Sequence, residues 1–289
     1  MRYVQIRAFH YVAIYGGFSR AADALCLTQP AISDQVRKLE SENDVRLFDR
    51  HSKKVALTPA GDRLLQITRR MFEAEESVAD FLSESRSIKT GQINLMADSV
   101  HHITAILMLF RQNYPDVFIS VKVGNSESIL NALRNYDADV GVLGNIPNNQ
   151  EYTALKLNST PIVAFVAQNS QLITKPTISL NELGELPLVL REKGSKTRAK
   201  LEDIAAASGV ELNAIIETEG REAVREIVSA NGGVGIVSEA EFGSGDGLRK
   251  VPISGEMMVM DEALVHLRER KDSKLIRAFM DVSGDVISR

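Results

Sequence analysis

The chain has one cysteine and no long apolar run, and these two shortages exclude several classes of protein. Cys26 is the single cysteine among 289 residues, so neither an internal disulfide nor a cysteine-based zinc fold is supported. The longest apolar stretches, such as residues 103–110, fall far short of the roughly 20 residues that span a membrane. The first seven residues lack the basic-then-apolar order of a signal peptide. We therefore expect a soluble, cytoplasmic protein without a membrane partner, with Cys26 packed in a short helix or, alternatively, sensing redox state.

The charge is unevenly distributed along the chain. Residues 1–58 hold nine Lys/Arg and six Asp/Glu, whereas the remaining 231 residues hold 25 and 32. A net charge of −4 over the whole chain therefore conceals a basic first segment. This segment is the candidate for contact with an anionic polymer.

Three short helices separated by tight turns are predicted at the N-terminus. Gly16-Gly17 ends the first helix, Ser19 is placed to cap a second helix over 20–25, and Thr28 is placed to cap a third that has Pro30 in its first turn. The first helix is indicated by apolar residues at helical spacing, which are Val4, Ala8, Tyr11, Val12 and Tyr15. This order is the helix-turn-helix pattern.

The third helix has one apolar side and one polar side. Gln29 is an amide suited to adenine, Pro30 and Ala31 fit thymine methyl groups, and Ser33 fits a base or a phosphate. Asp34 either accepts a bond from cytosine or pairs with a neighbouring cation, and its role stays open. The apolar side carries Ile32, Val36 and Leu39, and the polar side carries Pro30, Ser33, Asp34, Arg37 and Lys38.

Two short strands, residues 46–50 and 55–57, surround a basic tip at 51–54 and are interpreted as a wing. Such a wing contacts phosphates or a minor groove, adding salt-dependent affinity. The alternative is a three-helix packing module whose charges are merely solvated. The candidate DNA contacts are Ser19, Arg20, Thr28, Gln29, Pro30, Ala31, Ser33, Asp34, Arg37, Lys38, Arg50, Lys53 and Lys54.

A long helix is predicted from Thr58 and Pro59 to about Arg86, with Gly91 closing the connection. Its apolar residues repeat every seven positions, which favours pairing with a second copy of the same helix. The alternative is a helix that packs on its own second domain. The two columns of the repeat are Leu64, Met71, Val78 and Ser85, and Ile67, Ala74, Phe81 and Ile88.

From Gln92 onward, short apolar runs alternate with helical stretches, which predicts an α/β fold with a largely parallel sheet. One lobe is expected at about 92–161 and 263–289, and a second at about 162–262, with a ligand between them. Strands are expected at 93–97, 117–123, 139–143, 162–167, 186–190, 234–238 and 263–268, and helices at about 195–208 and from Lys274.

Polar residues at strand ends and helix starts point to an anion site between the lobes. Ser99 opens a helix after the first strand, and 193–198 combines hydroxyl groups with three cations. For each hydroxyl alone, helix capping is an equal alternative. The candidate effector contacts are Ser99, His101, His102, Gly124, Asn125, Ser126, Asn145, Ser195, Lys196, Thr197, Arg198 and Thr218.

Neither a metal nor a cofactor is expected. Adjacent residues of a helix diverge by about 100°, and no third ligand is evident near His101 and His102. The glycines of 231–235 follow a helix and precede a strand, the reverse of a nucleotide-binding loop. They are interpreted as a helix end and a tight turn.

The N-terminal motifs resemble those of the LysR-type regulators. Many fixed spacings match over about sixty residues, in the runs 18–22, 28–33, 35–36, 39–40, 47–48 and 57–58 and at Leu25, Arg50 and Gly61. Asn43-Asp44 stands where that family usually has Leu-Gly, and these residues tolerate the left-handed conformation that ends a helix. The resemblance implies a winged helix-turn-helix head, a long linker helix and a two-lobe α/β effector domain similar to periplasmic binding proteins.

The effector domain resembles the LysR branch associated with 2-aminoethylphosphonate catabolism. If so, Ser99 and the 195–198 loop would hold the phosphonate, and Glu127 or Glu217 would meet the ammonium group. The motifs behind this resemblance are 97–99 with His102, 124–126, Tyr136, 138–140, 188–192, 194–195 and 197–198.

We thus expect a DNA-binding head at 1–58, a linker helix at 59–91 and an effector domain at 92–289. The expected partners are double-stranded DNA with a two-fold symmetric site, a small anionic effector, a second copy through the linker helix with dimers pairing into tetramers, and RNA polymerase. Two alternatives remain: a DNA-binding protein without an effector, and an α/β enzyme. No serine elbow or phosphate loop supports the enzyme.

Overall fold

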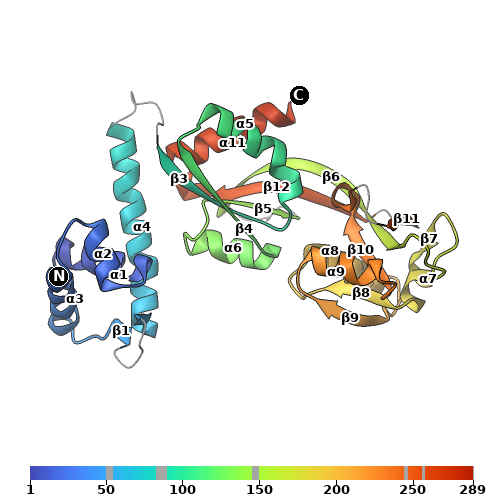
Figure 1. The fold of residues 1–289 in the computed structure, drawn as a ribbon, viewed down its shortest axis with the longest axis horizontal. Coiled ribbons are helices and arrows are strands. Elements are labelled where there is room, and N and C mark those ends of the chain that lie inside the picture. The colour runs from blue at the N-terminus through green and yellow to red at the C-terminus, as the bar shows by residue number, and fades with distance from the viewer. Residues whose placement is uncertain (50–54, 83–89, 145–149, 244–246, 256–257, 289) are drawn as a thin grey trace. The chain divides into compact units, whose positions relative to one another are not determined.

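A computed structural model describes residues 1–49, 55–82, 90–144, 150–243, 247–255 and 258–288. The chain divides into two compact units, Met1–Ser85 and Arg86–Arg289. The first unit is drawn in blue to cyan in Figure 1, and the second runs from green to red. Each unit is described by itself.

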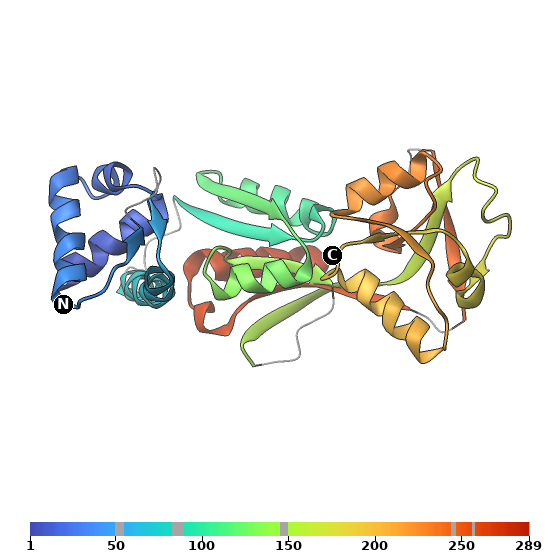
Figure 2. The same ribbon diagram turned by 90° about the horizontal axis from the view of Figure 1, so that it is seen from below.

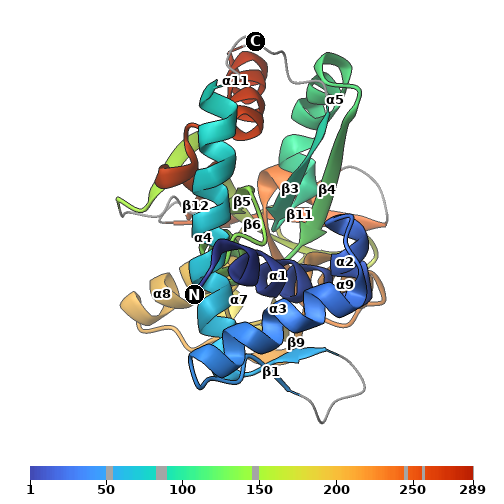
Figure 3. The same cartoon turned by 90° about the vertical axis from the view of Figure 1, so that its left-hand side faces the viewer.

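The first unit holds three helices, a two-stranded hairpin and a long helix (Figure 3). The predicted head is therefore confirmed in its elements, including the short strands of the wing. Their bounds are α1 Tyr3–Tyr15, α2 Phe18–Ala24, α3 Gln29–Glu42, β1 Phe48–Asp49, β2 Ala56–Leu57 and α4 Pro59–Leu82. The core is made of buried side chains from α1, α2, α3 and β1, against which partly buried residues of α4 pack; the buried residues include Phe9, Val12, Ala21, Ile32, Leu39 and Phe48.

The turns of the head use left-handed residues. Gly16 ends α1 with a φ of +61°, and its carbonyl accepts a 2.7 Å bond from the Arg20 guanidinium. Asp44 has a φ of +48°, and the Asn43 side chain donates to the Leu39 carbonyl at 2.8 Å. The turn expected at Asn43-Asp44 therefore survives the departure from Leu-Gly.

Two local predictions in this region are wrong. Helix α2 begins at Phe18 with Gly17 at its N-cap, so Ser19 lies inside the helix and does not cap it. Cys26 is exposed beyond the end of α2, with a φ of +54°, and does not pack in a helix. Gly17 at the N-cap lets α2 start before Ser19, and the left-handed conformation of Cys26 places that residue in the turn after the helix.

Helix α4 starts where the sequence predicts. The Thr58 hydroxyl accepts from the Gly61 amide at 3.1 Å and donates to the Arg46 carbonyl at 2.7 Å, so it caps the helix and ties it to the segment before β1. Gly61 permits this contact, because a Cβ there would lie 2.1 Å from the Leu47 carbonyl oxygen.

The second unit is built on a ten-stranded sheet with the order β4-β3-β5-β12-β6-β10-β8-β9, in which β11 pairs with β6 and β7. The strands are β3 Gly91–Ala97, β4 Val117–Val123, β5 Val140–Gly144, β6 Tyr152–Ala167, β7 Ile178–Ser179, β8 Leu188–Arg191, β9 Ala214–Thr218, β10 Val234–Ser238, β11 Leu248–Ser254 and β12 Val259–Leu267. The helices are η1 Val100–Ile103, α5 Thr104–Asn113, α6 Ser126–Arg134, α7 Leu180–Glu185, α8 Lys196–Ala207, α9 Arg221–Ser229, α10 Glu239–Phe242, η2 Arg268–Arg270 and α11 Lys274–Ile287.

Two lobes share this sheet (Figure 2). In the first, parallel strands β3, β4 and β5 pack against α5 and α11 around Phe110 and Phe279. In the second, β8, β9 and β10 are parallel, and a core of buried aliphatic side chains fills the space beside them. The predicted α/β fold with parallel strands in both lobes is confirmed.

Strands β6 and β12 are longer than predicted. The sequence analysis began one strand at 162 and the other at 263, but β6 starts at Tyr152 and β12 at Val259. The missed portion of β6 mixes exposed and half-buried residues, and that of β12 alternates half-buried and buried residues, so both lie outside the continuous apolar runs. The two strands pair antiparallel from Val259↔Pro161 to Leu267↔Tyr152, with a β-bulge between Glu262 and Ala263.

The turn predicted in the glycine-rich segment 231–235 is found over residues 231–233, whereas Gly235 lies in a strand. Helix α9 ends at Ser229, Asn231 has a φ of +61°, and β10 begins at Val234. Among the residues that the structure describes, no helix is long and apolar enough to cross a membrane.

His10 predicts a pH dependence of the head. Its imidazole lies between α1 and α4, 3.0 Å from the Thr68 hydroxyl and 4.4 Å from the Phe72 ring centre. Burial, and then the charge of Arg69, lower the pKa of His10 to about 4. Below pH 6.5 the imidazole of His10 is protonated in the unfolded chain but stays neutral in the folded chain. The free energy of unfolding therefore falls as the pH is lowered from about 6.5 to 4.

Between pH 7 and pH 5, we expect the free energy of unfolding of wild type to fall by about 1 kcal/mol more than that of His10→Gln. The difference is kept this small because the imidazole is only partly buried. Urea unfolding of the full chain at both pH values measures the difference. His101→Gln, which alters an exposed histidine of the other unit, is the control and should behave as wild type. Equal pH sensitivity in His10→Gln and wild type would contradict the assignment.

Candidate DNA-reading surface and effector-domain site

Helix α3 has the two faces that its sequence predicts. Ile32, Val36 and Leu39 are buried in the core of the first unit. The predicted contacts on the other side are exposed at Gln29, Pro30, Ala31, Arg37 and Lys38 and partly exposed at Ser33 and Asp34. The first turn of α3, which follows Thr28, therefore presents amide, methyl and hydroxyl groups to solvent.

Asp34 pairs with its own helix neighbours. Its carboxylate lies 3.0 Å from the Arg37 guanidinium and 2.7 Å from the Lys38 ammonium group. Hydrogen bonds from Lys38 and Arg37 hold the pKa of Asp34 below its usual range. Of the two roles left open by the sequence, pairing with neighbouring cations is the one found in the structure, and it orients both basic side chains on the exposed face.

A buried carboxylate connects α3 to the wing. Glu40 Oε1 accepts from the backbone amides of Leu47 at 2.8 Å and Phe48 at 3.3 Å. Leaving two buried N–H groups without acceptors would be costly, so Glu40 fixes the chain that leads into β1. This role of Glu40 was not predicted from the sequence. The feature that could have indicated it is a charged residue on the apolar side of the helix, directly after Leu39.

The other predicted DNA contacts lie apart from α3. Ser19 and Arg20 are exposed on α2, and Thr28 is exposed just before α3. The Arg20 guanidinium already bonds to the Gly16 carbonyl. Arg50, Lys53 and Lys54 of the wing lie outside the described residues.

Helix α4 carries an apolar stripe away from the head. Ile67 is 55% exposed and Val78 is 59% exposed, and Met71 and Ala74 fall between them at helical spacing. Leu64, the first residue of the predicted seam, instead packs against the core of the head. Phe81, Ser85 and Ile88 lie outside what the structure describes for side chains.

The predicted effector contacts fall into two groups in the second unit. One group follows β3 and contains Ser99, His101 and His102. The other combines Gly124, Asn125 and Ser126 at the start of α6 with Ser195, Lys196, Thr197 and Arg198 at the start of α8. Thr218 ends β9, and Asn145 lies outside the described residues.

The second group brings the two lobes together at Gly194. A Cβ on Gly194 would lie 3.0 Å from Asn125 Nδ2 and 3.3 Å from Glu127 Oε2, so the loop before α8 is directly against the start of α6. Asn125 caps α6 by accepting from the Ser128 amide at 3.0 Å. Ser195 is buried and caps α8, which is the alternative that the sequence left open.

Arg198 is bound within its own lobe. Its guanidinium contacts the Glu217 carboxylate and the Arg191 carbonyl at 2.6 Å and the Glu202 carboxylate at 2.7 Å. Lys196 is exposed and Thr197 is half-buried. The cationic side chains of residues 193–198 that face solvent are therefore Lys193 and Lys196 rather than Arg198.

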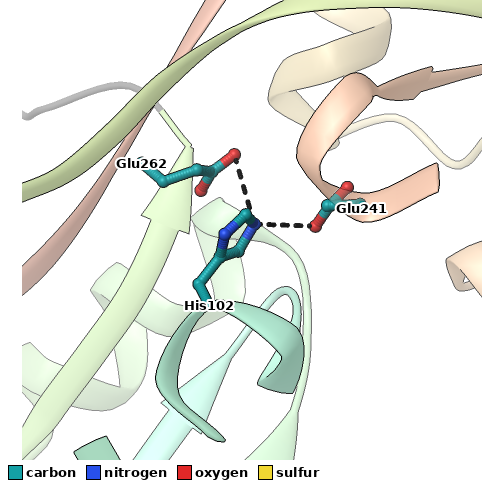
Figure 4. Close-up of side chains that lie close together, drawn as sticks. All are labelled: His102, Glu241 and Glu262. Carbon is teal, nitrogen blue, oxygen red and sulfur yellow. Dashed lines mark hydrogen bonds and ion pairs between the residues drawn. The ribbon is translucent and has the colours of Figure 1, made fainter. Parts of the chain in front are cut away.

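The first group contains a histidine beside two carboxylates (Figure 4). The His102 side chain is fully buried, and its Nε2 lies 3.3 Å from Glu241 Oε1 and 3.9 Å from Glu262 Oε1. Its Nδ1 lies 3.2 Å from Asn158 Nδ2. His101, in contrast, is exposed. No further ligand near His102 could be inferred from the sequence, because Glu241 and Glu262 reach it from α10 and β12.

Asp98, Ser99 and Arg221 complete this group. Arg221 Nη1 donates to the buried Ser99 hydroxyl at 2.6 Å and lies 3.2 Å from Glu241 Oε1. Asp98 Oδ2 accepts from the Gly144 amide at 2.9 Å. Arg221 begins α9, so its contacts with Ser99 join the second lobe to the first.

Burial and mutual repulsion dominate the electrostatics of these carboxyl groups. Burial, and then the charges of Asp98 and Glu241, raise the pKa of Glu262 to about 9. Burial and Glu241 likewise raise the pKa of Asp98 to about 6. Burial also acts on Glu241, but the hydrogen bond to His102 and the charge of Arg221 outweigh it and lower its pKa. A negative charge is thus supported on Glu241 and disfavoured on Glu262.

Each of the two units is matched by a model of a known protein family. The model of the LysR-family bacterial regulatory helix-turn-helix protein matches residues 3–62, and that of the LysR substrate binding domain matches 87–287. Transcriptional activator CmpR of Synechocystis sp. is 29% identical over 81% of this chain and 78% of its own. A RuBisCO operon transcriptional regulator of Allochromatium vinosum is 31% identical over the same shares.

Full-length CbnR, solved with its target DNA, has the same fold, with a TM-score of 0.68 at 19% identity over 99% of both chains. The families and relatives that match are transcriptional regulators rather than enzymes. With a helix-turn-helix head and a substrate-binding domain each matched over nearly its whole length, the chain belongs to the LysR family of DNA-binding transcriptional regulators.

Proposed function

We propose that this regulator reads its DNA site with the first turn of α3 in a major groove. The observation that carries the proposal is the exposed set at Gln29, Pro30, Ala31 and Ser33 on a helix whose opposite face is buried. An amide at Gln29 can bond to adenine with both its groups, and Arg37 and Lys38, oriented by Asp34, are suited to phosphates. The basic wing then adds affinity that depends on salt.

A gel-shift titration on the DNA upstream of its own gene and on a scrambled duplex tests this reading. Gln29→Ala and Ser33→Ala should weaken binding to the upstream DNA about tenfold or more and leave binding to scrambled DNA unchanged. Ser41→Ala is the matched control, since Ser41 is exposed at the far end of α3. Equal losses on both duplexes would exclude base reading by these residues.

We propose further that residues 59–91 form a linker whose helix pairs with a second copy. The support is the apolar stripe from Ile67 to Val78, which is too exposed to be covered by the head. Two heads joined in this way would read a two-fold symmetric site. Pairing of dimers into tetramers and contact with RNA polymerase belong to the same proposal.

Val78→Glu should disrupt the pairing, because it buries a charge in an apolar seam. Ala79→Glu adds the same charge at the adjacent exposed position and should leave the dimer intact. Sedimentation equilibrium of both variants and wild type measures the change. A Val78→Glu protein with the mass of wild type would show that the stripe is not the dimer contact.

We propose that the effector is a small anion held at Gly194, where the start of α6 meets the loop before α8. Lys196, the Thr197 hydroxyl and the amides at the start of α8 suit a phosphonate or phosphate, and Glu127 suits an ammonium group. A molecule with both groups, such as 2-aminoethylphosphonate, therefore fits the chemistry better than an anion alone. Its binding would change how the lobes are arranged and so how the heads hold DNA.

Isothermal titration of the full chain with 2-aminoethylphosphonate and with ethylphosphonate, which lacks the ammonium group, tests the effector. We expect 2-aminoethylphosphonate to bind at least about tenfold more tightly, and Glu127→Gln to remove most of that difference. Glu219→Gln, another exposed glutamate, is the control. Absence of binding by 2-aminoethylphosphonate would reject this effector and leave the regulator assignment unchanged.

A further inference from the structure

Three parts of the effector domain deliver metal-binding side chains to one point. His102 belongs to η1 in the first lobe, Glu241 to α10 in the second, and Glu262 to β12, which runs through both. One ligand atom from each lies within 4.8 Å of the other two. Ligand atoms about 2.1 Å from a tetrahedral ion are about 3.4 Å apart. The observed separations of 3.3 Å and 3.9 Å from His102 Nε2 are close to that spacing.

The carboxyl groups at this point have oxygen atoms without partners. Glu262 is only 2% exposed, and its Oε2 has no hydrogen-bond partner in the part of the chain that the structure describes. Asp98 Oδ1, buried beside it, lacks a partner in the same sense. Buried polar atoms are almost always paired, so two orphaned oxygens in one cluster indicate a missing ligand.

The backbone holds these oxygens in place. The β-bulge between Glu262 and Ala263 turns the Glu262 side chain toward His102 at a break in the pairing with β6. Gly144 on the neighbouring strand lies against the cluster, since a Cβ there would clash with Met260 Cε at 2.5 Å and would be in ordinary contact with Glu262 Oε1 at 3.4 Å and Asp98 Oδ2 at 3.7 Å. Both carboxyl groups therefore lie beside the backbone of Gly144.

The cluster has more acidic groups than cations to balance them. Among the described residues, Arg221 acts on Glu241 and Glu262, but it already bonds to Ser99 and lies beside Glu241. Arg191 contributes a weaker field at Asp98. Neighbouring carboxylates in a buried site repel one another unless a proton or a cation intervenes.

Asn158 can serve as the partner that orients a metal-binding imidazole. Its Nδ2 faces His102 Nδ1, and its Oδ1 is buried without a hydrogen-bond partner in the described chain. A half-turn of the amide group places Oδ1 on Nδ1, which then carries the ring proton. The lone pair of Nε2 is thereby free to bind a metal between Glu241 and Glu262, and a metal-binding histidine usually donates its other ring N–H to an acceptor of this kind.

We propose that His102, Glu241 and Glu262 hold one divalent transition-metal ion, for which Zn²⁺ is the test ion, with Asp98 as the adjacent oxygen donor. Imidazole with carboxylates is a donor set that suits Zn²⁺ better than Mg²⁺. Because the ligands come from both lobes, the ion ties the lobes together beside the Ser99–Arg221 contact. This site is separate from the effector position proposed at Gly194.

Isothermal titration of the full chain with ZnCl₂, without DNA or effector, tests the site. All proteins carry Cys26→Ser, since the exposed thiol is itself a zinc ligand. We expect one ion per chain, an affinity about 100-fold or more lower in His102→Asn and Glu262→Gln, and a higher melting temperature with Zn²⁺ than without it. Glu262→Gln keeps the shape of the side chain, so it remains informative even if His102→Asn folds poorly.

His101→Asn is the matched control, because it changes the adjacent but exposed histidine and retains every other surface site. It should bind Zn²⁺ as the parent protein does. Absence of one-to-one binding, or binding that persists in Glu262→Gln, would overturn the proposal and leave protons as the counter-charge of the cluster. A loss in His101→Asn equal to that in His102→Asn would place the ion elsewhere. None of these outcomes depends on which effector the protein binds.

Discussion

The antiparallel pairing of β6 and β12 is the constraint on which the effector domain depends. The two strands stay hydrogen-bonded from Pro161 and Val259 to Tyr152 and Leu267, and they carry the chain from one lobe to the other. Parallel strands of the first lobe attach through β5 to β12, and those of the second through β10 to β6. Any rearrangement of the lobes must therefore bend or twist this pair, and its β-bulge at Glu262 is the point where the ladder is already interrupted.

In the head, the equivalent constraint is the segment between α3 and β1. The Leu47 amide is bound by Glu40, and the Leu47 carbonyl accepts from the Thr58 amide and lies beside Gly61. Three elements, α3, the wing and α4, are thus positioned by contacts with one residue. The orientation of α3 relative to α4 follows from backbone hydrogen bonds and from the absence of a side chain at Gly61, both of which leave little room for variation.

The sequence predicted what is locally encoded. The faces of α3, the start of α4 at Pro59, the bounds of β4 and β10 and the start of α11 at Lys274 follow from apolar periodicity and capping residues, which act within a few positions. The misplaced start of α2 arises where Gly17 permits several turn geometries, and the exposed Cys26 arises because a non-glycine residue adopts the left-handed conformation after the helix.

The side-chain clusters of the effector domain were less predictable, since long-range topology decides them. Glu241 and Glu262 are separated from His102 by well over a hundred residues, and only the crossing strands bring them together. Arg198 was expected to face a ligand, but Glu202 and Glu217 take its hydrogen bonds, and this competition depends on the register of α8 and β9. The residue types indicated which groups could bind an anion or a metal, whereas the tertiary structure determines which side chain each of them contacts.

The acidic cluster also bears on how the lobes respond to a ligand. Ser99 and His102 of the first lobe are bound to Arg221 and Glu241 of the second, so separating the lobes there would expose a buried cation and carboxylate and break their hydrogen bonds. Buried ion pairs gain little net stability over apolar contacts, but losing one partner is costly. Such contacts therefore favour a particular arrangement of the lobes more than they stabilise the fold. A ligand shifts the equilibrium between two arrangements of the lobes only by the difference between its affinities for them. Groups that lie between the lobes are well placed to produce such a difference.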